Sequence, residues 1–291
     1  MEERTCFMIG MPASGKTTYL VSLVNMLMFR ERETLLTLKG CDRLEGMGNI
    51  REEIEQFNKF QPVARTIGVT GKWIEIPLYD KQENKVRLRI PDLSGEIFRD
   101  LVRERRLKKD TALCLEGTDI LLFFLNLDTI SEEQRISLDE DSTVKMIEKN
   151  YDESVIEKGK DQLKEVNTQE KKRVTQTDLV ELLQCVLHLS KKRVRVKFIL
   201  SAWDSIEKKS ELEACTPEKC MEKSLSMFFQ FLCSNPEQID YEIWGVSAQG
   251  FDFEDPEERK KRMLDDYGNH ARVIMPDGEE THDLTRLLCW N

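Results

Sequence analysis

A glycine-rich stretch near the start of the chain has the residue types that hold a phosphate chain. Residues 10–17 read G-M-P-A-S-G-K-T and fit the pattern G-x-x-x-x-G-K-[ST]. Gly10 and Gly15 allow a tight turn whose backbone N–H groups point at phosphate oxygens, and a helix that begins there adds the positive end of its dipole. In this pattern the lysine, Lys16, reaches the β- and γ-phosphates, and the hydroxyl of Thr17 binds Mg²⁺. The stretch therefore predicts a nucleotide-binding loop.

The segments on either side supply the setting that the loop requires. Residues 5–9 are a short apolar run typical of a buried strand, and residues 16–29 repeat apolar side chains at helical spacing. We therefore expect strand 4–10, then the loop, then helix 16–29. Four further loop residues are expected to line the nucleotide: Pro12, Ala13, Ser14 and Thr18.

A second segment with chemical potential is D-L-S-G at residues 92–95, directly after a predicted strand at 86–91. Asp92 is placed to hold Mg²⁺ through a coordinated water, and the backbone amide of Gly95 to sense the γ-phosphate. Glycine suits that position because a Cβ atom would obstruct a close approach of the backbone. The segment predicts the metal-binding and phosphate-sensing part of the site.

Two later segments are suited to recognising a base. Residues 198–204, F-I-L-S-A-W-D, form an apolar strand that ends in polar residues, and residues 244–249, W-G-V-S-A-Q, repeat that arrangement. Asp204 can accept hydrogen bonds from guanine N1–H and the 2-amino group, whereas adenine would leave the buried carboxylate unpaired. Backbone amides after the second strand can contact guanine O6. We expect four base-side residues besides Asp204: Ser201, Trp203, Ser247 and Ala248.

Together these segments resemble the motifs of the P-loop GTPases of the Ras-like (TRAFAC) class. Residues 10–17 are similar to their first motif, 92–95 to the third, 201–204 to the fourth and 247–249 to the fifth. More closely, I-G-M-P-A-S-G-K-T-T-Y-L, R-T, P-D-L-S-G-E and S-A-W-D look like the double-GTPase families of bacterial conflict systems. This resemblance implies binding of Mg²⁺ with GTP or GDP, a second GTPase or effector from the same gene cluster as partner, and a role in bacterial defence.

The chain departs from that class at two positions that bear on its chemistry. The usual fourth motif is N-K-x-D, but Ser201 and Ala202 replace its Asn and Lys, so Trp203 or another side chain must cover the base. Glu96 stands where the class carries a water-orienting Gln. A carboxylate cannot donate to the γ-phosphate and repels it, so we expect slow intrinsic hydrolysis.

The threonine that would clasp Mg²⁺ and the γ-phosphate should lie between helix 16–29 and a strand at 73–80. We expect Thr66 in this role, with Thr70 as the second choice. Arg65 beside it is then either an arginine that offsets charge on the transferring phosphoryl group or a solvated loop cation. The catalytic residues we expect are therefore Lys16, Thr66, Glu96 and Arg65.

Two other functions remain compatible with these motifs. One is a scaffold that stays locked with bound nucleotide and never hydrolyses it, as Glu96 and the altered fourth motif allow. The other is a small-molecule kinase that uses ATP, with a lid in the basic helix 99–109 or in residues 131–176. The basic helix is alternatively a solvated face or a partner-binding surface that follows the nucleotide state. Its cations are Arg99, Arg103, Arg105, Arg106, Lys108 and Lys109.

The surrounding elements predict an α/β fold with a doubly wound, mostly parallel sheet, helices on both faces and one antiparallel edge strand. We expect further strands at 34–39, 73–80, 86–91, 119–127, 194–200 and 241–246, and helices at 43–58, 96–109 and 217–233. Residues 1–291 form a single domain in this interpretation. It carries a charged insertion at about 131–176 and a C-terminal helical extension at about 251–291, with helices at 256–264 and 283–290. Four apolar residues should dock the last helix on the sheet: Leu284, Leu287, Leu288 and Trp290.

Composition limits the remaining classes of function. The 44 Lys and Arg against 54 Asp and Glu give a net charge of −10, which argues against a general nucleic-acid surface. No segment approaches the ~20 apolar residues that span a bilayer. The eight cysteines include no C-x-x-C pair and are expected to be reduced, as in a cytoplasmic protein.

Overall fold

The structure is a computed structural model of the chain. It describes residues 3–29, 33–38, 50–61, 74–90, 96–130, 174–190, 193–265 and 270–290. Most of the predicted insertion, residues 131–173, lies outside these ranges.

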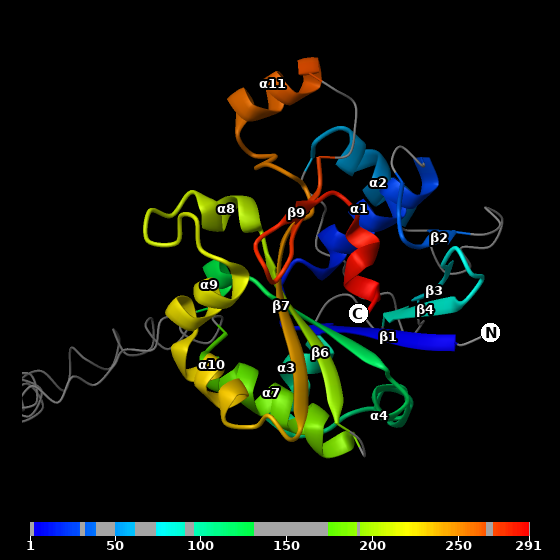
Figure 1. The fold of residues 1–291 in the computed structure, drawn as a ribbon, viewed down its shortest axis with the longest axis vertical. Helices are drawn as coiled ribbons and strands as arrows, with labels where there is room; N and C mark the ends of the chain where they lie inside the picture. The colour runs from blue at the N-terminus through cyan, green and yellow to red at the C-terminus, as the bar shows by residue number, and fades with distance from the viewer. Residues whose placement is uncertain are drawn as a thin grey trace, which may run out of the picture.

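A nine-stranded sheet organises the described residues, in the order β2-β3-β4-β1-β5-β6-β7-β8-β9 (Figure 1). Its five central strands pair in parallel: β4 (Lys85–Ile90), β1 (Glu3–Gly10), β5 (Ile120–Leu125), β6 (Val194–Ser201) and β7 (Ile239–Ser247). This parallel core confirms the predicted doubly wound fold. It also places the carboxyl ends of neighbouring strands at one edge, where ligands bind in such sheets.

Antiparallel strands flank this core on both sides, whereas one edge strand was expected. On one side β3 (Ile74–Tyr79) pairs with β4, and β2 (Thr37–Leu38) pairs with β3. On the other side β8 (Arg272–Ile274) and β9 (Glu280–Thr281) form a hairpin beside β7. The sequence analysis did not predict this hairpin, which lies between the two helical segments of the C-terminal extension. The P-D-G sequence at 276–278 is the turn signal that could have revealed the hairpin.

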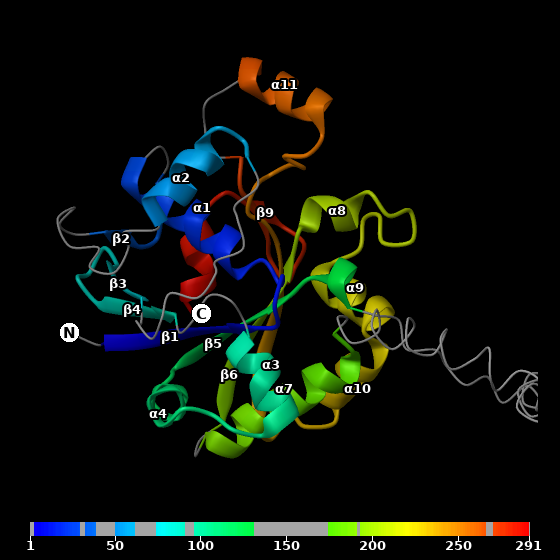
Figure 2. The same ribbon diagram turned by 180° about the vertical axis from the view of Figure 1, so that it is seen from behind.

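Helices cover both faces of the sheet, as Figures 1 and 2 show. Side chains along β1 alternate between two hydrophobic clusters, Cys6 and Met8 entering one and Phe7 and Ile9 the other. The first cluster includes α1 (Lys16–Phe29), α2 (Ile50–Asn58) and the 3-10 helix η3 (Leu284–Leu288). The second includes α3 (Glu96–Glu104), α4 (Lys109–Glu116), α7 (Gln176–Leu189), α8 (Trp203–Glu207), α9 (Pro217–Ser224) and α10 (Ser226–Cys233). Burial on both faces explains why β5 reads I-L-L-F-F-L without polar alternation.

The local backbone explains where helix boundaries differ from the prediction. The helix expected at 96–109 ends at Glu104 because Arg105 adopts a left-handed conformation, with φ of 52°. The helix expected at 217–233 is interrupted at Leu225. Helix α7 begins with a capping box between Thr175 and Asp178, so the chain re-enters the fold before residue 176. The charged helix in the C-terminal region, α11 (Pro256–Asp265), agrees with the prediction.

The ends of the predicted insertion lie beside each other. Ile130 forms an isolated parallel bridge with Val174. The chain therefore leaves the sheet after the short 3-10 helix η1 (Leu127–Thr129) and returns at nearly the same place. This closeness fits the insertion expected at about 131–176, within which Val174 and Thr175 already contact the described fold.

The end of the chain is anchored by a buried lysine in the centre of the sheet. Leu284, Leu287 and Leu288 are fully buried, as predicted. Lys197 of β6, 1% exposed, donates to the backbone oxygens of Arg286, at 3.1 Å, and Cys289. Its Nζ also lies 3.2 Å from Glu242 Oε2 and 4.3 Å from the centre of the Trp244 ring. Burial lowers the pKa of Lys197, and the Glu242 carboxylate opposes this shift. The ammonium thus has a partner for each of its donors.

We expect Lys197→Met to lower the free energy of unfolding by about 2–4 kcal/mol, since it removes the buried ammonium that pairs with Glu242 and hydrogen-bonds two carbonyl groups. Urea unfolding followed by circular dichroism measures this change. Lys81→Met is the control, because Lys81 pairs with Glu33 on the surface, where both side chains are largely exposed. Its unfolding midpoint should match that of the unaltered protein. Equal midpoints for the two variants would contradict an anchoring role of Lys197.

Candidate functional site

Two glycines shape the loop between β1 and α1. Gly15 has φ of +88°, in the left-handed region, and a Cβ atom there would lie 2.8 Å from the side chain of Ser201. A Cβ atom on Gly10 would lie 2.6 Å from Ser14 Oγ and 2.7 Å from the Phe124 oxygen. Any larger residue would force the loop away from β5 and β6. Glycine at both positions is therefore required by packing as well as by the turn.

The side chain of Lys16 lies inside this loop. It is 3% exposed, and its Nζ donates to the oxygens of Gly10 at 2.8 Å and Met11 at 2.9 Å, and to Ser14 Oγ at 3.1 Å. Three contacts hold the positive charge on the concave side of the loop. A cation held beside a tight turn and the start of a helix is suited to binding an anion. Thr17 and Thr18 follow on the first turn of α1 and are half-buried, while Pro12 and Ala13 lie on the more exposed side of the loop.

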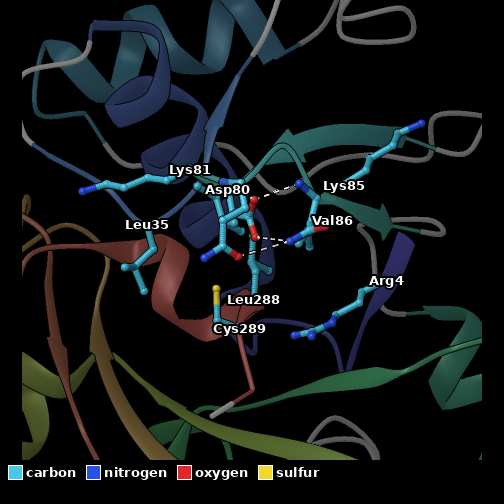
Figure 3. A pocket seen from close by; sticks show the side chains of 11 residues that line it. Arg4, Leu35, Asp80, Lys81, Lys85, Val86, Leu288 and Cys289 are labelled. Carbon is cyan, nitrogen blue, oxygen red and sulfur yellow. Dashed lines mark hydrogen bonds between the residues drawn. The ribbon is translucent and has the colours of Figure 1, made fainter. Parts of the chain in front are cut away.

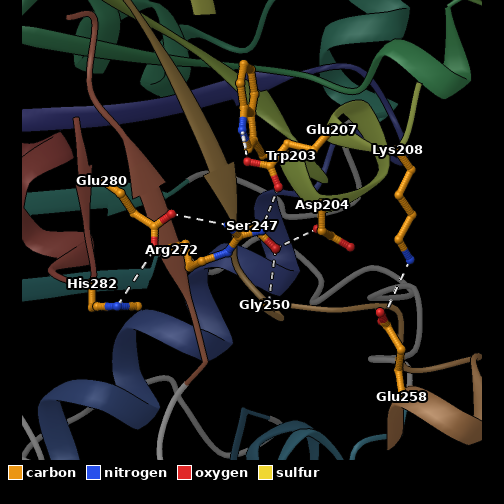
Figure 4. A network of polar contacts seen from close by, with 10 residues as sticks. All are labelled: Trp203, Asp204, Glu207, Lys208, Ser247, Gly250, Glu258, Arg272, Glu280 and His282. Atoms are coloured by element: carbon orange, nitrogen blue, oxygen red, sulfur yellow. Dashed lines mark hydrogen bonds and ion pairs between the residues drawn. The ribbon is translucent and has the colours of Figure 1, made fainter. Parts of the chain in front are cut away.

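The two predicted base-side segments meet at the same edge of the sheet (Figure 4). β6 and β7 pair in parallel, with Ser201 opposite Val246, so the residues that follow them are neighbours. Ser247 Oγ donates to Asp204 Oδ1 at 2.5 Å and accepts from the backbone N–H of Gly250 at 3.1 Å. Ser247 is fully buried, and the next residue, Ala248, is 9% exposed. The buried hydroxyl therefore fixes the orientation of the Asp204 carboxylate.

Ser201 joins the base side to the phosphate side. It is 6% exposed, and its Oγ donates to the Leu125 oxygen at 3.2 Å. The same side chain limits the space beside Gly15, as described above. Ala202, with φ of 52°, then turns the chain out of β6 and into α8. Non-glycine residues adopt this conformation rarely, and such residues cluster at functional sites.

Trp203 was expected at the base, but its ring has a different place. Its side chain is 3% exposed, and its Nε1 donates to Glu207 Oε1 at 2.8 Å. A Cβ atom on Gly245 of β7 would lie only 2.5 Å from the indole. The ring therefore packs between α8 and β7, where it is buried and does not cover a base in this conformation.

A set of charged residues that the sequence analysis missed braces α8. Arg272 donates to Glu207 Oε2 at 2.8 Å and to Glu280 Oε2 at 3.2 Å, and His282 Nε2 lies 3.8 Å from Glu280 Oε1 (Figure 4). Arg272 and Glu280 belong to the β8–β9 hairpin. The helix that carries Asp204 is thus tied to the C-terminal region. Recognising that hairpin from its turn sequence would have suggested this contact.

Several predicted site residues lie outside the described ranges. These are Arg65, Thr66, Asp92 and Gly95. Glu96 is the first described residue after them, and its backbone begins α3. Within the described part of the chain, no three His, Cys, Asp or Glu residues gather as a metal site. Thr17 follows the loop between β1 and α1, and its hydroxyl is suited to bind Mg²⁺, because that ion prefers oxygen ligands.

A separate cavity of about 260 Å³ lies away from these residues (Figure 3). Its lining includes Arg4, Leu35, Asp80 and Cys289. Arg4 is near the amino end of β1, whereas the phosphate loop follows the carboxyl end of that strand. We place the candidate functional site at the carboxyl ends of β1, β6 and β7. The predicted site residues Lys16, Asp204 and Ser247 lie there.

Comparisons with known proteins identify the family. The profile of the family described as Double-GTPase 1 matches residues 7–291. No curated protein matches the chain. In the described part of the chain, no helix is long and apolar enough to cross a membrane.

Solved structures with a similar fold include three GTPase-related proteins. The bacterial selenocysteine-specific elongation factor EF-Sec is 11% identical with a TM-score of 0.37, and the match covers 91% of this chain and 29% of that one. The signal recognition particle receptor SRb–GTP/SRX complex from Chaetomium thermophilum is 11% identical with a TM-score of 0.38, covering 84% and 90%. The GTP-bound GTPase-like domain of S. cerevisiae Ski7 is 10% identical with a TM-score of 0.40, covering 86% and 44%. The chain therefore spans less than a third of the elongation factor and less than half of the Ski7 chain.

The contact between α8 and β7 leads to a stability prediction. We expect Gly245→Ala to lower the free energy of unfolding by about 1–3 kcal/mol, since the new methyl group would overlap the Trp203 ring. Gly117→Ala is the matched control, because the nearest atom to a Cβ atom there is 3.6 Å away and φ is −86°. That control should leave the value unchanged or raise it by up to about 1 kcal/mol. Thermal unfolding compares the two variants, and an unaffected Gly245→Ala protein would rule out the close packing.

Proposed function

The chain belongs to the Double-GTPase 1 family, and we propose that it is a GTP-binding switch that hydrolyses GTP slowly with Mg²⁺. One observation carries the proposal: at one edge of the sheet, a glycine-containing loop that holds a buried lysine lies near a carboxylate whose orientation is fixed by a hydrogen bond. Lys16 occupies the loop, and Ser247 holds Asp204. Ser201 contacts both neighbourhoods. We further propose that residues 1–291 act as one domain with a charged insertion at about 131–176.

The phosphate side would bind through charge and backbone amides. On GTP binding, Lys16 would exchange some of its carbonyl contacts for β- and γ-phosphate oxygens, which are stronger partners because they are ionised. Thr17, Asp92 and Thr66 would hold Mg²⁺, and this ion supplies charge neutralisation on the β- and γ-phosphates. The remaining loop residues, from Gly10 to Thr18, would surround the phosphates.

The base side would select guanine. Asp204, fixed by Ser247, offers carboxylate oxygens to the N1–H and 2-amino groups, and the backbone at Ser247 and Ala248 lies close to it. Adenine has an acceptor at the first position and no amino group at the second, so it would leave the carboxylate unpaired. A nucleoside kinase that uses ATP would have no use for this carboxylate. The arrangement therefore favours the GTP-binding function.

Hydrolysis would be slow because of Glu96. The water-orienting position would carry a negative charge next to the γ-phosphate, and Arg65 is the cation proposed to offset charge during transfer. Slow turnover suits a switch, whose GTP-bound form must last long enough to act on a partner. Gly95 would couple the γ-phosphate to α3 and its basic C-terminal end. The partner is proposed to be a second GTPase or an effector in a bacterial defence system, as the resemblance of the sequence motifs to the double-GTPase families implies.

A nucleotide-binding panel tests the proposal. Calorimetry with Mg²⁺ should show GTP and GDP binding to the unaltered protein, with ATP at least 100-fold weaker. Lys16→Ala should abolish binding of all nucleotides. Asp204→Ala should instead reduce the preference for GTP over ATP by roughly a hundredfold while ATP affinity changes little. Lys81→Ala, at the opposite end of the sheet, should bind as the unaltered protein does. Failure to bind GTP, or a preference for ATP, would overturn the proposed function.

Single-turnover hydrolysis separates the slow GTPase from a scaffold that never hydrolyses GTP. We expect phosphate release over tens of minutes to hours, and roughly tenfold faster release by Glu96→Gln. An amide can donate to the γ-phosphate and does not repel it. The matched control is Glu104→Gln at the other end of α3, which should leave the rate unchanged. No release by either the unaltered protein or Glu96→Gln would favour the scaffold.

A further inference from the structure

The segment that follows β5 contacts the phosphate loop, although no motif in the sequence marks it. Asn126 directly follows the last residue of β5, and its Nδ2 donates to the Ala13 oxygen at 3.3 Å. Its side-chain oxygen accepts from the backbone N–H of Asp128 at 3.0 Å and so caps η1. Both ends of the Asn126 amide are therefore engaged, and its orientation is fixed.

Asp128, two residues later, contacts the base-side helix. Its Oδ2 accepts from Ser205 Oγ at 2.9 Å, and its Oδ1 lies 2.6 Å from Lys209 Nζ. Ser205 is the residue after Asp204. Burial alone would raise the pKa of Asp128, but the hydrogen bonds from Lys209 and Ser205 outweigh it and lower the pKa. The carboxylate is therefore ionised at neutral pH.

The strand order explains why this segment can reach both sides. β5 lies between β1 and β6, so its carboxyl end lies between the phosphate loop and α8. Asn126 reaches to one side and Asp128 to the other. The two residues and η1 form a continuous hydrogen-bonded connection from Ala13 to the neighbour of Asp204.

We propose that Asn126 and Asp128 are positioning residues that set the spacing between the phosphate loop and the guanine-recognising helix. This inference rests on the proposed function. A nucleotide that contacts both the phosphate loop and α8 binds more tightly when their spacing is already fixed, because the protein loses less conformational freedom on binding. A ligand that occupies only the phosphate loop gains nothing from it. Removing the connection should therefore weaken the binding of a whole nucleotide but not the binding of a ligand that contacts only the phosphate loop.

Its contribution to folding should be small. Asp128 and Lys209 are each more than 40% exposed as side chains, and exposed ion pairs contribute little to stability. Loss of the connection should thus leave the folded protein intact. An effect on nucleotide affinity can then be separated from an effect on folding.

The test compares GDP with pyrophosphate as ligands of the same variants, by calorimetry or by competition against a fluorescent GDP. Asp128→Ala should weaken GDP binding by roughly threefold to tenfold and leave pyrophosphate affinity within about twofold. The thermal midpoint should be unchanged. Lys208→Ala is the matched control, because Lys208 precedes Lys209 but pairs with Glu258 of α11 at 3.7 Å. It should bind both ligands as the unaltered protein does.

A charge exchange tests whether the contact itself is responsible. Lys209→Asp should weaken GDP binding, since it sets two carboxylates against each other, and adding Asp128→Lys should restore most of the affinity. Equal losses for GDP and pyrophosphate, no loss for either, or no restoration in the double variant would each overturn the inference. Absence of GDP binding by the unaltered protein would instead overturn the proposed function, and the positioning role would fall with it.

Discussion

β1, β5, β6 and β7 pair in parallel, and this pairing brings the ends of segments that are distant in sequence to one edge. The pairing leaves very little space between these ends. Gly15 and Ser201 are so close that a single methyl group would not fit between them. A loop that approaches its neighbours this closely can be built only from residues without side chains at the contact points. The glycines of this loop therefore serve the packing of the sheet edge and, in the proposed function, also the binding of phosphate.

The sequence predicted the features of the fold and site that depend on neighbouring residues better than those that depend on contacts between distant segments. Helix α1 matched its predicted limits because its start is set by Gly15 and its length by an apolar repeat, both local signals. Two strands that each end in polar residues predicted that Ser247 and Asp204 lie at one edge of the sheet, but not the hydrogen bond between them. The burial of Trp203 was not predictable, because it depends on Gly245 of another strand. The break at Arg105 was equally hidden, since nothing in an arginine indicates a left-handed backbone.

The C-terminal residues have a larger role than a docked helical extension would have. Lys197 holds the chain end on one face of the sheet, and Arg272 ties the β8–β9 hairpin to α8. The two contacts differ in physical character. A buried ammonium with a full set of partners is costly to disturb, because loss of one partner leaves charge in a region of low polarity. A partly exposed arginine between two carboxylates tolerates change more easily. The first therefore anchors the chain end, and the second guides the position of the helix.

Base recognition by the proposed switch depends on how many hydrogen-bond acceptor sites of the Asp204 carboxylate remain for guanine after Ser247 has used one. A carboxylate has about four lone-pair sites, and the hydroxyl of Ser247 uses one of them on Oδ1. No described residue donates to Oδ2, so enough acceptor sites remain for the two donors of guanine. The Ser247 hydroxyl is itself restrained by the Gly250 amide, so it cannot follow a different base by rotating. Selectivity then arises from rigidity as well as charge, because a carboxylate that cannot turn away must remain unpaired when adenine is present.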